Sequence, residues 1–189
     1  THFKPYLLAE TQDSMQWPVR WADTRVLPSL IAAMKPEIRK QFLSPLYAWM
    51  SADRQGNMLC WQGAGDPNPR RANFEYWPLD DASFAKLVEE AETDAVISKI
   101  YDVRADLLKN HSPAKCHSLV SKNLAIASAN GINGAEARQS FSILSLSLVE
   151  QFSQHPAMSA LLAHTKQGAA YLNELNALPD EFWQECAIQ

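Results

Sequence analysis

The chain has 189 residues, of which 47% are hydrophobic, and a formal net charge of −4. This composition is long and apolar enough to build one sizeable core or two small lobes, and it excludes a disordered chain. The acidic balance argues against a nucleic-acid or anionic-membrane surface, and no apolar run approaches the ~20 residues that span a bilayer. We therefore expect a soluble, cytoplasmic protein without nucleic-acid binding or direct membrane insertion.

The first predicted element is a strand. Trp17, Val19 and Trp21 fall at period two, which predicts a strand over residues 15–23 with one buried face. Pro18 has no N–H to donate to a neighbouring strand, so it marks an edge strand or the end of a strand.

Two helices are predicted next. The first covers residues 26–34, and the second begins at Pro36, where the missing N–H of proline costs nothing. The second helix would continue to residue 49, because one apolar face is kept by Ile38, Phe42, Leu46 and Trp49.

Residues 52–80 hold three of the six glycines and three of the eleven prolines. They surround two short apolar runs, 58–61 and 74–77. We predict that these runs form a hairpin joined by a long mobile loop over 62–72.

From Asp80 onward the pattern is helical. Helix boundaries are predicted at Leu79-Asp80-Asp81, Ser112-Pro113, Asn130-Gly131, Asn133 with Glu136, His155-Pro156 and Leu178-Pro179-Asp180. The predicted fold class is therefore α+β, predominantly helical: a few short strands in residues 1–79 are followed by a helical lobe of four or five helices in residues 80–189.

The run from Phe141 to Val149 alternates like a strand, but its length and its flanking helices favour a buried helix that continues to about residue 153. On that helix Phe141, Leu144 and Leu148 share one face, and Ile143 and Leu146 lie off it. Two arrangements fit this pattern. Ile143 and Leu146 line a groove for an amphipathic or transmembrane-like segment of a partner, or the helix is wrapped on all sides.

The sequence contains no catalytic motif: it has no glycine-rich phosphate loop, His-Glu-x-x-His, Gly-x-Ser-x-Gly or Cys-x-x-Cys. Asp102 and Asp106 are best explained as a solvated helix face. Cys116 and His117 are adjacent, so on a helix they point about 100° apart, which is poor geometry for a nucleophile and its base. The three widely spaced cysteines fit neither a disulfide framework nor a zinc site. We expect no catalytic residue, no metal and no cofactor.

A dense charged segment, Arg20-Trp21-Ala22-Asp23-Thr24-Arg25, follows the predicted strand. Asp23 can cap the next helix and lie between two guanidinium groups, as a caged carboxylate that locks the strand to the helix. In the alternative interpretation, one arginine is left available for an acidic group on a partner.

This segment also carries a family resemblance. Arg20-Trp-Ala-Asp-Thr-Arg-Val-Leu-Pro-Ser-Leu30, followed by Phe42-Leu-Ser-Pro-Leu-Tyr-Ala-Trp49, resembles the signature Arg-aromatic-x-Asp-x-Arg-Val-Leu and Phe-x-Gly-Pro of the type VI secretion effector chaperones. Ser44 stands where the family has glycine. Residues 107–116, 127–132 and 152–156 match the family's helical tail in order and spacing, so the resemblance covers residues 3–162.

The resemblance implies a function. It implies a chaperone or adaptor that binds a type VI effector toxin in the cytoplasm of a Gram-negative bacterium and helps to load it onto the spike protein of the secretion apparatus. It also implies that the family's first strands and helices precede Thr1, so that residues 1–79 are the C-terminal portion of an α/β lobe.

Six tryptophans without a catalytic motif suit a protein that holds apolar segments, because aromatic residues dominate interface hot spots. The candidate partner-binding residues are Trp17, Trp61, Trp77, Ile143 and Leu146. In the simpler interpretation most of the tryptophans belong to the core. Two other functions stay open: an immunity-type protein that blocks a toxin, and a helical hydrolase built on the carboxylates or the histidine named above.

Overall fold

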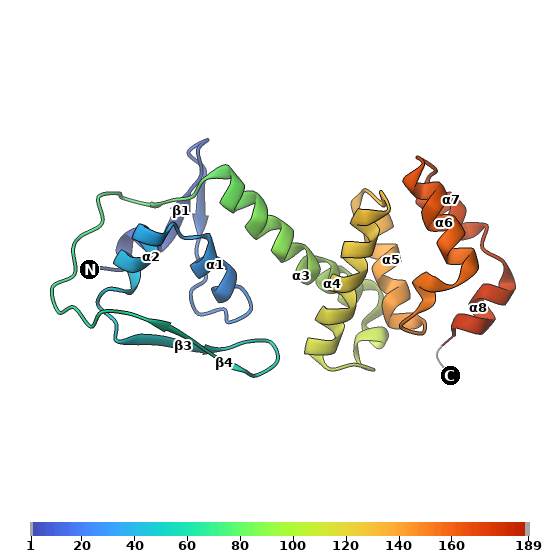
Figure 1. Ribbon diagram of the computed structural model, residues 1–189, viewed down its shortest axis with the longest axis horizontal. Coiled ribbons are helices and arrows are strands. Elements are labelled where there is room, and N and C mark those ends of the chain that lie inside the picture. Colours follow the sequence, from blue (N-terminus) through green and yellow to red (C-terminus); the bar gives the residue numbers. More distant parts are fainter. Residues whose placement is uncertain (1, 188–189) are drawn as a thin grey trace. The chain divides into compact units, whose positions relative to one another are not determined.

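A computed structural model describes residues 2–187 (Figure 1). The chain divides into two compact units, Thr1–Ala91 and Glu92–Gln189, and the division falls within helix α3 (Asp81–Leu108). Helices make up 55% of the chain and strands 11%, with the strands first and the helices after them. The predicted α+β, predominantly helical fold is confirmed.

A small three-stranded sheet organises the first unit. Its central strand β1 (Leu8–Glu10) follows a short 3-10 helix, η1 (Lys4–Tyr6), and pairs antiparallel with β2 (Gln16–Pro18) and parallel with β5 (Trp77–Pro78). The strand predicted over residues 15–23 is thus confirmed only for β2. Pro18 ends this strand at the edge of the sheet, as its missing N–H requires.

Helices α1 (Leu27–Ala33) and α2 (Pro36–Leu43) follow, and Pro36 occupies the first turn of α2 as predicted. The extension of α2 to Trp49 is wrong. The helix ends at Leu43 because Pro45, two residues later, has no N–H to continue the helical hydrogen bonds.

A second, two-stranded sheet is formed by β3 (Ala48–Ala52) and β4 (Met58–Gln62). The two strands are antiparallel, and Trp49 lies opposite Trp61. The turn between them is closed by the Asp53 carboxylate, which accepts the backbone N–H of Asn57 at 2.8 Å. The predicted pairing of 58–61 with 74–77 is therefore wrong, because a short turn to β3 closes at lower entropic cost than a long loop to residue 74.

The segment predicted to be a mobile loop is held to its surroundings. Gly63, Gly65 and Asp66 donate their backbone N–H groups to the carbonyls of residues 47, 46 and 44 at 2.8–3.0 Å. The Gln41 amide of α2 donates to the carbonyls of Arg70 and Arg71. Five positions of the predicted loop are thus bonded to neighbouring segments, and the mobility of residues 62–72 stays a prediction.

The second unit contains the rest of α3 and five further α-helices within the described residues. These are α4 (Pro113–Ala129), α5 (Ala135–Ser147), α6 (Pro156–Lys166), α7 (Tyr171–Asn176) and α8 (Asp180–Cys186), with a 3-10 turn, η2 (Phe152–Gln154), before α6.

Several predicted helix ends are confirmed. Asp80 accepts the N–H of Ser83 at the start of α3, Ser112 accepts that of Lys115 at the start of α4, and Gly131 adopts a φ of +71° after α4. The capping box of Asn133 and Glu136 is wrong, because Gly134 occupies the N-cap of α5 and has no side chain to accept a bond. Helix α5 also ends at Ser147 rather than near residue 153.

Helix α5 contributes side chains to two hydrophobic clusters of the second unit. Phe141, Leu144 and Leu148 pack into a cluster with the helices that follow α5. Leu146, with Ile143 at its border, packs into the other cluster with α3 and α4. None of the helices in residues 2–187 is long and apolar enough to cross a membrane.

Candidate functional site

An aromatic stack joins three segments of the first unit. The Trp21 indole N–H donates to the Tyr6 carbonyl at 2.8 Å, and its ring stacks on Phe42 with centroids 4.5 Å apart. The Phe42 ring in turn stacks on Trp49 of β3, with centroids 5.5 Å apart. Trp21 therefore fixes the chain after β2 against α2, which is a structural role for this residue.

One side of this stack is open as an apolar pocket of about 430 Å³. Phe42, which is buried, lies at its base. The pocket is lined by Phe3, Trp21, Phe42, Leu46, Ala48, Trp49 and Met50. Since none of these side chains is charged and the rings fix one another's orientation, the pocket is suited to an apolar side chain presented from outside.

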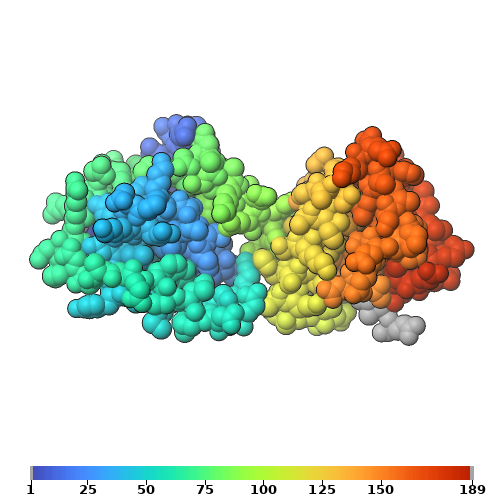
Figure 2. All heavy atoms as spheres, viewed as in Figure 1, coloured from blue at the N-terminus to red at the C-terminus, as the bar shows by residue number. Residues whose placement is uncertain are grey.

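The sheet beside the pocket has two different faces. Trp49, Leu59 and Trp61 turn towards the first unit and are half-buried, whereas Met50 and Met58 on the other face are 60% and 64% exposed. Figure 2 shows that the hairpin, coloured cyan to teal, lies at the surface of the first unit. Flexible methionine side chains on such a surface adapt to partners of different shape.

The charged segment after β2 forms one ion pair. Asp23 accepts both Nε and Nη2 of Arg25, at 2.9 and 2.7 Å, and also the Arg25 backbone N–H at 3.1 Å. These bonds hold the pKa of the Asp23 carboxyl at about 2. Arg20 is exposed and adds only a weaker electrostatic attraction. The full cage is therefore wrong: Asp23 is held from one side, by a guanidinium group that is 56% exposed.

The three tryptophans chosen as partner-binding candidates lie in different environments. Trp77 is 1% exposed in the core of the first unit, so it cannot touch a partner and its selection is wrong. Trp61 is half-buried opposite Trp49. Trp17 is 39% exposed and packs on Phe84 of α3, with ring centroids 5.2 Å apart. Of the three, Trp17 presents the most surface.

The groove predicted at Ile143 and Leu146 is wrong. Leu146 is 1% exposed, and Ile143 is half-buried against the same cluster. Because α3 and α4 cover this side of α5 and later helices cover the other, α5 is wrapped on all sides. The apolar excess of this run is explained by a central position in the second unit.

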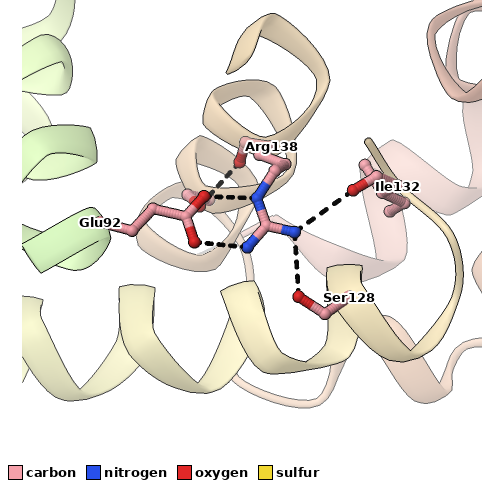
Figure 3. A network of polar contacts seen from close by, with 5 residues as sticks. Glu92, Ser128, Ile132 and Arg138 are labelled. Carbon is pink, nitrogen blue, oxygen red and sulfur yellow. Dashed lines mark hydrogen bonds and ion pairs between the residues drawn. The ribbon is translucent and has the colours of Figure 1, made fainter. Parts of the chain in front are cut away.

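The second unit also contains a polar network (Figure 3). The Arg138 guanidinium of α5 binds both carboxylate oxygens of Glu92 in α3, at 2.5 and 2.6 Å. It also donates to the Ser128 hydroxyl at 3.0 Å and to the Ile132 carbonyl at 3.4 Å. The guanidinium thus links α3 and α5 to the end of α4, and its partners leave it no free face for a ligand.

The catalytic candidates do not assemble into a site. Asp106 is paired with Arg104 at 2.8 Å on the surface, at a break in α3. The Cys116 thiol is buried and lies 3.7 Å from the Leu108 carbonyl, and burial raises its pKa. A protonated, buried thiol is a poor nucleophile. No group of three or more potential metal ligands occurs among residues 2–187.

No protein-family model, curated protein or solved structure matches this chain. The candidate site is an apolar pocket beside an exposed sheet that carries two methionines. Sequence reasoning missed Ala48 and Met50 as site residues because residues up to 49 were assigned to a helix. Pro45, which follows the end of α2, was the signal that could have shown that residues 46–49 do not continue the helix.

Proposed function

We propose that this protein is a cytoplasmic chaperone or adaptor that binds a type VI secretion effector toxin and helps to load it onto the spike protein. The proposal combines the family resemblance of residues 20–49 with one structural observation, the apolar pocket whose wall includes Trp21, Phe42 and Trp49. Trp21 and Phe42 match positions of the signature, and Trp49 lies in the segment that follows it. Residues of the resembling segments thus build a pocket that can hold an apolar side chain of a protein.

The chemistry of the pocket supports binding rather than catalysis. Its lining offers no nucleophile, no acid or base, and no histidine, cysteine or carboxylate that could hold a metal. A pre-formed aromatic pocket can anchor a protein interface, because a large apolar side chain buried in the pocket contributes much of the binding free energy.

Co-purification with the toxin encoded beside this protein, and then with the spike protein, tests the function. We expect a stoichiometric complex of chain and toxin that forms before the spike protein is added. If the chain neutralises the toxin in cells but has no effect on its loading, it is an immunity protein and the adaptor proposal fails.

Met50→Glu and Met58→Glu form a matched pair that tests the pocket. The two methionines are similarly exposed, but only Met50 lines the pocket. Met50→Glu should weaken toxin binding about tenfold or more, because a carboxylate at the rim opposes entry of an apolar group. Met58→Glu should leave binding within about twofold, and neither change should lower the melting temperature by more than about 2 °C. Equal loss of binding in both variants would place the contact elsewhere on the sheet.

A further inference from the structure

The outer edge of β3 carries backbone groups that are not used. In an antiparallel ladder the hydrogen-bonded pairs alternate, and the Gly63 N–H bonds to the Tyr47 carbonyl at 3.0 Å. Trp49 therefore exchanges its bonds with β4, whereas the N–H and C=O groups of Ala48 and Met50 point away from β4. Within residues 2–187 these groups of Ala48 and Met50 have no hydrogen-bond partner, and β3 pairs with no other strand.

This edge lacks the features by which proteins normally protect an edge strand. Ala48–Ala52 reads Ala-Trp-Met-Ser-Ala and contains neither a charged residue nor a proline. Such an edge is a template for pairing with another strand. By contrast, the edge strand β2 of the other sheet ends in a proline, Pro18, which cannot donate.

The apolar pocket lies along this same edge. Ala48, Trp49 and Met50 all line it, and no residue of β4 does. Consecutive residues of a strand point to opposite faces, so a cavity that touches all three lies at the side of the strand rather than on one face. The side facing β4 is occupied, which leaves the outer edge. Free backbone groups and a pocket for a side chain therefore occur together.

We propose that an extended, uncharged segment of the toxin adds to the outer edge of β3 as a third strand and places a large apolar side chain in the pocket. This inference rests on the proposed function. The backbone of the added strand bonds to Ala48 and Met50, which supplies affinity. Alternate side chains of that strand point to the two faces, so one set reaches the pocket and the other lies beside the exposed Met50.

A second copy of this chain is a poorer occupant of the same edge. Strand β3 has five residues and is about 17 Å long. Pairing two such edges buries far less than the ~800 Å² per partner that a stable interface needs. In addition, the Trp49 side chain of each copy is already packed in its own aromatic stack, so Met50 is the one large side chain of a second β3 that is free to reach the pocket.

Backbone amide exchange tests the edge directly. The probe is a short peptide of alternating leucine and threonine with a lysine at each end. In the free protein the Met50 amide should exchange fast and the Trp49 amide slowly, since only the latter is bonded to β4. Saturating probe should slow exchange at Met50 about tenfold or more and leave Trp49 unchanged. Slow exchange at Met50 before any probe is added would mean that the edge is already paired, and the proposal would be wrong.

Proline substitutions separate strand addition from simple apolar contact. Met50→Pro removes an N–H that points outward, so the pairing of β3 with β4 is kept. Cys60→Pro makes the same change on β4, whose residue 60 lies opposite Met50. Met50→Pro should weaken probe binding about tenfold or more, and Cys60→Pro should not. If Met50→Pro does not fold, a probe N-methylated on alternate backbone nitrogens replaces it, and equal affinity of the two probes overturns the proposal.

Measurements of toxin binding test strand addition and the proposed adaptor function separately. If wild-type protein binds the toxin and Met50→Pro binds it equally well, strand addition is wrong and the adaptor function stands. If wild-type protein binds no toxin but Met50 is protected by the probe, the edge is a strand-binding site and the adaptor function fails. A dimer in solution that Met50→Pro converts to monomer would assign the edge to a second copy and overturn the proposal.

Discussion

Arg138 and Glu92 form a two-point ion pair that joins α5 to α3 within the second unit, with N–O distances of 2.5 and 2.6 Å. The Arg138 side chain is 16% exposed and that of Glu92 is 33% exposed. Because the guanidinium is largely withdrawn from water and bonded to two further acceptors, loss of either partner leaves polar groups without their bonds. This arrangement differs from ion pairs such as Lys35–Asp80 and Lys115–Glu150, whose lysine side chains are exposed.

A double-mutant cycle of Glu92→Gln and Arg138→Gln should give a coupling free energy of about 1–3 kcal/mol, measured by denaturant unfolding. The pair Lys86–Glu90 is the control, because it joins exposed side chains four residues apart on one helix. Its coupling should not exceed about 0.5 kcal/mol. Similar coupling free energies in both cycles would mean that the burial of Arg138 does not strengthen its interaction with Glu92.

Gly63→Ala should destabilise the first unit strongly. A Cβ on residue 63 would lie 2.1 Å from the Leu46 carbonyl oxygen and 2.3 Å from that of Leu43, and neither backbone atom can move without displacing the end of α2. We expect a loss of about 3 kcal/mol or more in the free energy of unfolding. Gly56→Ala is the control: its φ of +86° is strained for alanine, but the space around it is open. Its cost should be about 1–2 kcal/mol.

Tyr6→Phe should leave the protein as stable or more stable at neutral pH. The Tyr6 ring is fully buried, and its hydroxyl has no hydrogen-bond partner among residues 2–187. Burial raises the pKa of the Tyr6 hydroxyl from 10.0 to about 12. As pH rises past the unfolded-state pKa, the unfolded chain loses this proton first, so the wild type loses stability between about pH 10 and 12. The phenylalanine variant should not show this loss at residue 6, and urea unfolding at pH 8 and above pH 10 measures the difference.

The structure separates what local sequence signals determine from what depends on long-range packing. Asp80, Ser112 and Gly131 act within a few residues of themselves, so their roles as helix caps could be predicted from sequence alone. The partner of a strand is not a local property. Nothing in the sequence of residues 58–61 indicates whether they pair with β3 or with residues 74–77.

The candidate site also depends on how distant segments pack together, which the sequence pattern does not indicate. Trp49, Phe42 and Trp21 could be singled out in the sequence as large aromatic residues, but not as the walls of one pocket, because that requires β3 to fold back along α2. The sequence pattern also does not indicate which tryptophan side chains are buried. Trp17 and Trp77 are each followed by a proline, yet one is 39% exposed and the other 1%.

Asp23→Asn should lower stability by about 1 kcal/mol or less near pH 7, since the paired Arg25 is 56% exposed and water screens the pair. The folded-state pKa of Asp23, about 2, lies below the ordinary value of 3.8. The pair therefore stabilises the protein fully above about pH 4, and this contribution is lost as pH falls from about 4 to 2. The difference between variant and wild type should shrink over that interval. A difference that stays constant down to pH 2 would show that the asparagine acts through something other than the lost charge.

The last prediction concerns the central helix of the second unit. Leu146→Asp should cost about 4 kcal/mol or more and unfold this unit, because the side chain is 1% exposed within the cluster that α5 shares with α3 and α4. Ile143→Asp should cost less, since Ile143 is only half-buried at the border of that cluster. Val149→Asp is the control, because Val149 lies two residues after the end of α5 and is 38% exposed.

Circular dichroism with denaturant unfolding of the three variants gives the order of their costs, and it also tests where a partner binds. A helix wrapped on all sides predicts that Leu146→Asp impairs partner binding only by unfolding the second unit. If Leu146→Asp keeps the melting temperature of the wild type and yet loses the toxin, the face of α5 at residue 146 is open in solution. The toxin would then bind the second unit, and the pocket beside β3 would not be its principal binding site.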